Sequence, residues 1–226
     1  MTGSPPAPPS PALSPPPAPP PAPAAATGPD AAARSGLSIG VDGLARCAWG
    51  AGSDEYRRYH DQEWGRAVRG DDALFERLTL EAFQSGLSWL TILRKRAAFR
   101  AAFDGFQIAK VASYGDADVE RLLADAGIVR NRAKIEAAVA NARAALDLPT
   151  GLAELLWSYA PPPRAARPAT MAQVPASTPE STALARALKR HGFRFVGPTT
   201  AYALMQATGM VDDHVAGCHV APPVVG

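Results

Sequence analysis

His214-Val215-Ala216-Gly217-Cys218 is the stretch near the C-terminus that decides how this chain is organised. Its histidine and cysteine stand four residues apart, and Cys47, the other of the two cysteines, has His60 thirteen residues after it. Imidazole and thiolate are the ligands that zinc takes in closed tetrahedral sites. Residues four apart on a helix share one face, so we expect a helix that presents His214 and Cys218 together. The pattern indicates a Cys2His2 site, with two buried thiols and two unrelated histidines as the alternative.

Such a site would join the beginning of the folded body to its end. Closing so long a loop restricts the unfolded chain, so the metal would stabilise the fold. His219, next to Cys218, is a rival ligand. Four protein ligands leave no position for a reacting water, so we expect the metal to be structural.

Composition separates residues 1–36 from the rest of the chain. Thirteen of the 23 prolines fall between positions 5 and 29, and no charged residue precedes Asp30. A segment of Pro, Ala and Ser without charge buries little surface, so we expect a disordered tail. Residues 37–226 fit one domain of ordinary size. The tail lacks the basic start and apolar run of a signal peptide, and no later run reaches the roughly 18 apolar residues of a membrane span.

The cysteine content and the net charge limit which cellular compartment and which partners we expect. Two cysteines without a secretion signal favour a reducing cytoplasm. The formal net charge of +2 permits nucleic-acid binding but does not argue for it.

Hydrophobic spacing predicts an all-α fold, a single domain of short helices. Leu74, Phe75, Leu78 and Ala82 keep helical spacing after Asp71-Asp72. No alternating strand pattern of useful length appears. The expected helices span residues 71–86, 88–103, 108–114, 118–126, 132–146, 151–159 and 180–191, with a last one starting at Pro198.

The segment around Gly197 joins the last two predicted helices. Free backbone N–H groups at the start of the second helix, around Thr199, can hold a phosphate. Basic side chains precede it, namely Arg186, Lys189, Arg190 and Arg194. They suit a nucleic-acid backbone. The simpler interpretation is an ordinary turn between helices with a solvated basic face.

Aromatic residues crowd the start of the body, and one acidic residue stands in an apolar context. The aromatic residues are Trp49, Tyr56, Tyr59 and Trp64, joined further on by Trp89. Their rings can stack on a planar base or attract a cationic one, or they can simply form core. Glu81 lies between Leu80 and Ala82, where an unpaired carboxylate is costly unless it binds a donor. A surface position on the helix is the alternative for Glu81.

Five segments in register carry a resemblance to a known family. They are Arg46-Cys47-Ala48-Trp49, residues 59–65 (YHDQEWG), 80–89 (LEAFQSGLSW), 125–135 (DAGIVRNRAKI) and 213–218 (DHVAGC). Together they resemble 3-methyladenine DNA glycosylase I, a zinc-containing branch of the helix-hairpin-helix glycosylases, from about Arg46 to Cys218. The resemblance implies that Cys47, His60, His214 and Cys218 are the zinc ligands.

The resemblance also implies an activity, hydrolysis of the N-glycosidic bond of 3-methyladenine in alkylated DNA that leaves an abasic site. It implies a base pocket of Trp49, Tyr56, Tyr59, Trp64 and Trp89, in which Glu81 contacts the base. A base in duplex DNA reaches such a pocket only by flipping. Leu87 is the expected wedge, and Gly197, Thr199, Lys189, Arg190 and Arg194 the expected DNA contacts. We expect a monomer that acts on double-stranded DNA in a bacterial cytoplasm and that contacts no membrane.

Two other classes of protein are weighed against this activity. A non-catalytic, zinc-stabilised DNA-binding module would keep the hairpin and the basic flank but has no need of Glu81. A zinc hydrolase would need an open coordination position, which four protein ligands do not leave.

Asp212 marks a departure from the family pattern. The broader helix-hairpin-helix group has a catalytic aspartate at this place, before a His-Val pair, and the 3-methyladenine branch is described as lacking it. Here Asp212 supplies a carboxylate, which either acts in catalysis or caps the helix expected to carry His214. No lysine stands in the matching hairpin helix, which argues against a Schiff-base lyase activity.

Overall fold

A computed structural model describes residues 36–222 of the chain. The tail predicted for residues 1–36 therefore lies outside the described residues, apart from Gly36. In the described part, helices dominate and a two-stranded antiparallel sheet is the only sheet, which confirms the all-α prediction.

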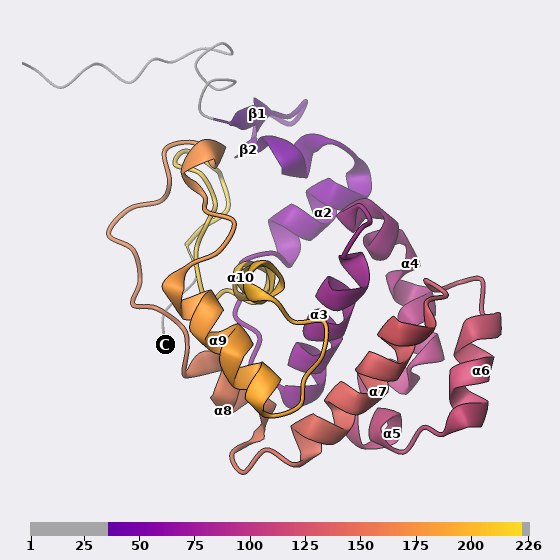
Figure 1. Cartoon of the computed structure of the whole chain (residues 1–226). Helices are drawn as coiled ribbons and strands as arrows, with labels where there is room; N and C mark the ends of the chain where they lie inside the picture. The colour runs from indigo at the N-terminus through magenta and orange to yellow at the C-terminus, as the bar shows by residue number, and fades with distance from the viewer. Residues whose placement is uncertain (1–35, 223–226) are drawn as a thin grey trace, which may run out of the picture.

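The elements follow one another along the chain with short connections (Figure 1). They are β1 (Leu37–Ile39), β2 (Ala45–Cys47), η1 (Ala48–Ala51), α2 (Asp54–Gln62), α3 (Asp71–Gln84), α4 (Trp89–Ala102), η2 (Asp104–Phe106), α5 (Ile108–Ala112), α6 (Asp116–Ala124), α7 (Arg132–Leu146), α8 (Gly151–Trp157), η3 (Met171–Gln173), α9 (Pro179–Arg190) and α10 (Pro198–Ala207).

The core is built around α3. Figure 1 shows α9 and α10 on one side of this helix and α5, α6 and α7 on the other. Leu74, Phe75 and Leu78 of α3 are fully buried, as the predicted apolar spacing requires. Phe83 packs edge-on against Phe99 of α4, with ring centroids 4.8 Å apart. Burying one such side chain contributes roughly 1.5–3 kcal/mol, so α3 is a rigid base for the residues it carries.

The two-stranded sheet and α2 were not predicted. β1 pairs with β2 in an antiparallel register that sets Leu37 opposite Cys47, but three residues a strand are too few to show alternation. α2 was missed because it is mostly polar. Its start was readable, since the Ser53 side chain accepts the N–H of Tyr56 as an N-cap.

No helix in residues 36–222 is both long and apolar enough to cross a membrane.

We expect that deleting residues 1–35 leaves folding and activity unchanged, because a Pro/Ala segment offers little apolar surface to bury. Gly36 is retained, since its carbonyl accepts the N–H of Ala48 at 2.7 Å. The thermal midpoint of the truncated and full chains, measured side by side, should agree within about 2 °C, well under the shift that 1 kcal/mol produces. A larger loss would mean that the tail packs on the domain.

A candidate metal centre beside a buried glutamate

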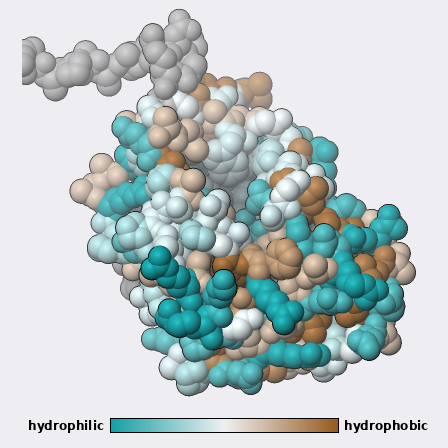
Figure 2. All heavy atoms as spheres, viewed as in Figure 1, coloured by the Kyte–Doolittle hydropathy of each residue, from teal (hydrophilic) through white to brown (hydrophobic). Residues whose placement is uncertain are grey.

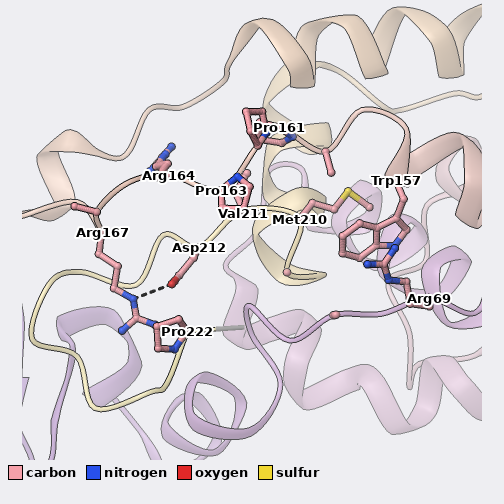
Figure 3. Close-up of a pocket in the computed structure, with 15 residues that line it drawn as sticks. Arg69, Trp157, Pro161, Pro163, Arg164, Arg167, Met210, Val211, Asp212 and Pro222 are labelled. Carbon is pink, nitrogen blue, oxygen red and sulfur yellow. Dashed lines mark hydrogen bonds and ion pairs between the residues drawn. The ribbon is translucent and has the colours of Figure 1, made fainter. Parts of the chain in front are cut away.

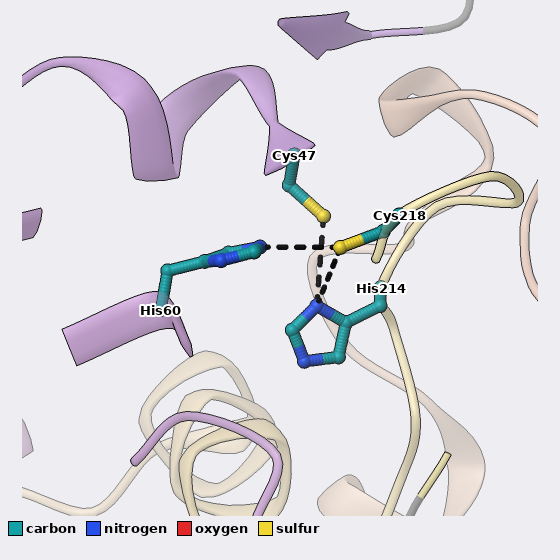
Figure 4. A group of neighbouring side chains, drawn as sticks. All are labelled: Cys47, His60, His214 and Cys218. Atoms are coloured by element: carbon teal, nitrogen blue, oxygen red, sulfur yellow. Dashed lines mark hydrogen bonds between the residues drawn. The ribbon is translucent and has the colours of Figure 1, made fainter. Parts of the chain in front are cut away.

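Two cysteines and two histidines meet in one buried cluster. Figure 4 shows Cys47, His60, His214 and Cys218 converging from separate segments, and their ligand atoms all lie within 4.8 Å of one another. The Cys218 sulfur is 3.5 Å from His60 Nε2 and 3.5 Å from His214 Nδ1, and the Cys47 sulfur is 3.7 Å from His214 Nδ1. A tetrahedron with ordinary Zn–S and Zn–N bonds places sulfur and nitrogen roughly 3.5 Å apart. The cluster therefore has the dimensions of a zinc site.

The local chain explains how the four ligands are placed. Cys47 ends β2 and His60 lies in the last turn of α2. Gly50 lets these segments approach, since a Cβ atom there would lie 2.6 Å from the His60 ring. His214 and Cys218 lie on a tight turn with Gly217 at φ +90°. The predicted helix across residues 214–218 is therefore wrong, because this turn brings the two ligands together instead.

Hydrogen bonds outside the cluster fix the orientation of each imidazole. His60 Nδ1 lies 2.8 Å from Asp61 Oδ1, and His214 Nε2 lies 3.4 Å from the carbonyl oxygen of Trp64. Each ring thus presents its other nitrogen to the cluster, as metal-binding histidines do.

Asp61 organises the rim of the cluster. Arg46 donates to it at 2.8 and 3.0 Å, and His219 Nε2 lies 3.0 Å from Oδ1. Burial would raise the pKa of Asp61, but these partners outweigh burial and hold the pKa well below its usual range. His219, the rival ligand in the sequence, therefore meets Asp61 and not the two sulfurs.

The two thiols cannot both ionise without a cation. Contact with Cys47 is the largest influence that lowers the pKa of the Cys218 thiol, and the two imidazoles lower it further. The Cys218 sulfur in turn is the largest influence that raises the pKa of Cys47, and burial adds to it. A divalent metal ion would remove this conflict, because it stabilises both thiolates.

The predicted aromatic residues form one wall that starts at the cluster. Trp49 contacts Trp64 edge-on at 4.9 Å between centroids and His60 at 5.2 Å. Tyr56 packs on the outer side of Trp49, and its hydroxyl accepts the N–H of Leu90 at the start of α4. Tyr59 lies between Trp49 and Trp89, with centroids 6.3 and 5.4 Å away. The structure thus brings together all five predicted aromatic residues.

Glu81 is buried next to this wall. It is 7% exposed, and among the described residues no side chain or backbone group hydrogen-bonds its carboxyl group. Burial raises the pKa of Glu81 from 4.5 to about 8. Burial also raises the pKa of Tyr59, and the negative charge of Glu81 adds to that shift. The indole N–H of Trp89 is buried and has no partner in the described part of the chain.

A charge network around Glu63 includes Arg77, whose charge also lowers the pKa of Glu81 against the larger effect of burial. Glu63 accepts hydrogen bonds from Arg77 at 3.0 Å and from Arg96 at 2.5 and 2.7 Å. Burial alone would raise the pKa of Glu63, yet the two arginines lower it to about 2. Arg77, one helical turn before Glu81, is thus paired with Glu63. The sequence did not point to this network, because its members come from the residue that follows α2, from α3 and from α4.

Three of the predicted DNA contacts, Lys189, Arg194 and Gly197, line one cavity, whereas Leu87, Arg190 and Thr199 do not. Ser85, Lys189, Arg194, Gly197 and neighbouring residues line this cavity of about 410 Å³. Figure 2 shows strongly hydrophilic side chains gathered where α9 ends. Leu87 is 41% exposed. Arg190 and Thr199 are exposed as well, Thr199 in the first turn of α10.

Asp212 lies apart from the base pocket, at a cavity of about 370 Å³ (Figure 3). In the described chain, none of the predicted base-pocket residues lines this cavity. Arg167 donates to Asp212 Oδ2 at 2.8 Å, and Asp212 Oδ1 accepts the N–H of His214 at 3.2 Å. Asp212 therefore holds the turn that carries His214, and there is no helix for it to cap.

Comparison with known proteins places the chain in a family. Residues 49–221 match the methyladenine glycosylase family. The chain belongs to that family. It is 45% identical over 179 residues to DNA-3-methyladenine glycosylase 1 of Escherichia coli (strain K12), a match that covers 77% of this chain and 96% of that protein.

Solved structures agree with this assignment. A crystal structure of 3-methyladenine DNA glycosylase I gives a TM-score of 0.75 at 44% identity, covering 78% of this chain and all (100%) of that one. A structure of 3-methyladenine recognition by the Staphylococcus aureus enzyme gives a TM-score of 0.74 at 35% identity, covering 80% and 98% of the two chains. The family predicted from the five sequence motifs is therefore confirmed.

Proposed function

We propose that the protein removes 3-methyladenine from alkylated DNA by hydrolysing the N-glycosidic bond. The observation that carries the proposal is Glu81, a buried carboxyl group without a hydrogen-bond partner among the described residues, whose charge acts on Tyr59 of the aromatic wall. Relatives at 45% and 40% identity are named as DNA-3-methyladenine glycosylases. A site that leaves a buried acid unpaired needs a ligand that pairs it.

The chemistry of the lesion fits these residues. Methylation at N3 makes adenine cationic within DNA, and the base leaves as a neutral molecule when the bond to the sugar breaks. Electron-rich rings attract such a cation, and the Glu81 carboxylate accepts hydrogen bonds from its polar edge. Water adds to C1′ of the sugar and loses a proton. Because the leaving group is already activated, selective binding carries much of the catalysis.

We propose zinc as the metal of the Cys2His2 cluster. Cys47, His60, His214 and Cys218 would fill all four positions of one zinc ion, which supplies structural cross-linking and no reacting water. Such a site would hold β2 and α2 against the C-terminal turn. The aromatic wall begins at this cluster, so the positions of its rings would depend on the same metal cross-link.

The DNA would bind across the groove between α9, α10 and the end of α3. We assign backbone phosphate to the amides around Gly197 and Thr199 at the start of α10, with Lys189, Arg190 and Arg194 beside them. Leu87 would fill the gap that the flipped base leaves. One copy of the chain carries all of these residues, so we expect a monomer that acts on chromosomal DNA in the cytoplasm.

Release of methylated bases from alkylated duplex DNA, separated by chromatography, tests reaction and substrate together. We expect 3-methyladenine in the soluble fraction and none from unmethylated duplex. Binding of the duplex without release of any base would favour the alternative, a non-catalytic DNA-binding module. That alternative gives no reason for a costly buried acid at position 81.

Asp212→Asn should change the excision rate by less than about twofold. Asparagine can still accept the His214 N–H, and the carboxylate already pairs with Arg167 away from the base pocket. A transition-state contact would instead be worth on the order of tenfold or more. Single-turnover rates on alkylated duplex decide, with zinc content measured in parallel. A tenfold slower variant that retains its zinc would assign Asp212 a catalytic role.

A further inference from the structure

Lys134 is a buried lysine that reaches from one helix to the end of another. It is 9% exposed and lies in the first turn of α7, whose N-cap Asn131 accepts the backbone N–H of Lys134 at 3.1 Å. Its ammonium group donates to the carbonyl oxygens of Phe83 at 2.9 Å and of Ser85 at 2.6 Å. Both carbonyls belong to the C-terminal end of α3.

The segment that Lys134 holds leads directly into the exposed Leu87. Gly86 adopts φ +83°, and the Leu87 N–H donates to the carbonyl of Gln84 at 2.7 Å, so residues 85–87 form a tight turn. Among the described residues, Lys134 is the only one whose side chain hydrogen-bonds the main chain of residues 83–87. In the described chain, Lys134 is thus the side chain that ties the main chain of this turn to another helix.

Placing a lysine here is costly. Burial lowers the pKa of Lys134, because an ammonium group loses its hydration inside the protein. The carbonyls at the end of a helix carry partial negative charge and lack intrahelical partners, so a cation is the group that suits them. Arginine side chains tie other helix ends in a similar way, since Arg121 donates to the carbonyl of Ala102 at the end of α4 and Arg143 to that of Ala112 at the end of α5. Lys134 differs from both arginines because it is buried.

We propose that Lys134 is a positioning residue for base flipping, which fixes the turn at residues 85–87 so that Leu87 enters the duplex. The inference rests on the proposed function, since it assigns a role within the same reaction. Lys134 acts through the main chain of this turn and contacts neither the base nor the aromatic wall. Glu81 is held by the preceding turn of α3, so capture of a free base does not require Lys134.

The test compares Lys134→Met with Lys95→Met. Lys95 is a matched control, because its ammonium group also donates to two carbonyls, those of Ala126 at 2.9 Å and Gly127 at 3.1 Å, but not near Leu87. We expect Lys134→Met to slow single-turnover excision from duplex DNA on the order of tenfold or more, as small misplacements do. Its dissociation constant for free 3-methyladenine should change less than about twofold, and Lys95→Met should match the parent in both.

A double-mutant cycle with Leu87→Ala separates positioning from a general structural role. If Lys134 acts through Leu87, Lys134→Met should cost less than about twofold in the Leu87→Ala background. Amide exchange at Leu87 should also accelerate in Lys134→Met. Additive effects of the two substitutions, or parallel losses of excision and free-base binding, would overturn the inference. If Lys134→Met does not fold, Lys134→Gln enters the same cycle with the same expectations.

Failure of the inference and failure of the proposed function give different results. If the parent releases no methylated base, the function is wrong. If the parent is active and Lys134→Met excises at the parental rate, only the role of Lys134 is wrong.

Discussion

Replacing Cys47 with serine should abolish stoichiometric zinc binding and lower the thermal midpoint markedly. Cys47 supplies one of two sulfurs in a cluster whose ligands come from β2, α2 and the turn after α10. Loss of the metal would leave a neighbouring thiol and two imidazoles buried without their cation, and would release the C-terminal turn. We expect a loss of about 3 kcal/mol or more in unfolding free energy. For a domain of this size that corresponds to roughly 6–12 °C.

His219→Ala is the control for this substitution. His219 neighbours Cys218 in sequence but meets Asp61 on the rim, so the variant should retain one zinc per chain. Metal content and thermal midpoint should fall together in Cys47→Ser and in His214→Ala, and a chelator should bring the parent to the same midpoint. Zinc absent from the native protein would contradict the proposed metal. Zinc lost from His219→Ala but kept in His214→Ala would show that His219, and not His214, is the zinc ligand.

The ligands of the cluster were predictable because few residue types bind zinc and the chain has only two cysteines. Their local geometry was not. A four-residue spacing suggests a helix, but Gly217 at φ +90° favours a turn, and the Ala216 N–H of this turn donates to the distant carbonyl of Pro168. The chemistry of a site is thus readable from residue types, whereas its backbone depends on contacts with distant segments.

The helices of the body were predictable for a related reason. Apolar residues at helical spacing in α3 and α7 must face a core. Two acidic residues mark the first turn of α3, and the Asn131 cap marks the start of α7. The polar α2 escaped because its buried face is aromatic and metal-binding and not aliphatic. Tyr56, Tyr59 and His60 stand at helical spacing after Ser53, a signal that could have identified the helix.

Contacts between distant segments could not be read from the sequence. Lys134 meets Ser85 across 49 positions, and Glu63 meets Arg96 across 33. Periodicity describes one element at a time, so it shows that a lysine begins a helix but not which carbonyl it reaches. The role of Asp61 was partly predictable, since a carboxylate next to a metal-binding histidine in the sequence often orients the imidazole ring.

Glu81→Gln should make the protein more stable at high pH and less active. In the unfolded chain the carboxyl group ionises near 4.5, but burial raises the pKa of Glu81 to about 8 in the fold. Below pH 4.5 it is neutral in both states, and burial has no electrostatic cost. As pH rises from 4.5 to 8 the unfolded state loses its proton first, so folding stability falls, and above pH 8 the full cost remains. Glutamine removes this cost, on the order of a few kcal/mol.

Denaturant unfolding at pH 5, 7 and 9 measures this effect. The advantage of Glu81→Gln over the parent should be small at pH 5 and grow to its maximum at pH 9. Glu154→Gln, which changes an exposed glutamate of α8, is the matched control and should show no such growth. A pH-independent difference between Glu81→Gln and the parent would mean that the acid is hydrated or paired in solution.

The same substitution should slow excision of 3-methyladenine from DNA by about tenfold or more. It should also lower affinity for the free, neutral base, because the amide replaces one acceptor oxygen with an N–H donor group. A cationic base in the pocket lowers the pKa of Glu81 and so favours its ionised form. The carboxylate then attracts the base, and this attraction offsets in the complex the cost that burial imposes on the free protein. Glutamine can accept a hydrogen bond but supplies no charge. Greater stability together with weaker excision excludes unfolding as the cause of the loss. Parental binding and parental rates in Glu81→Gln would remove this residue from the pocket and leave its burial without a functional reason.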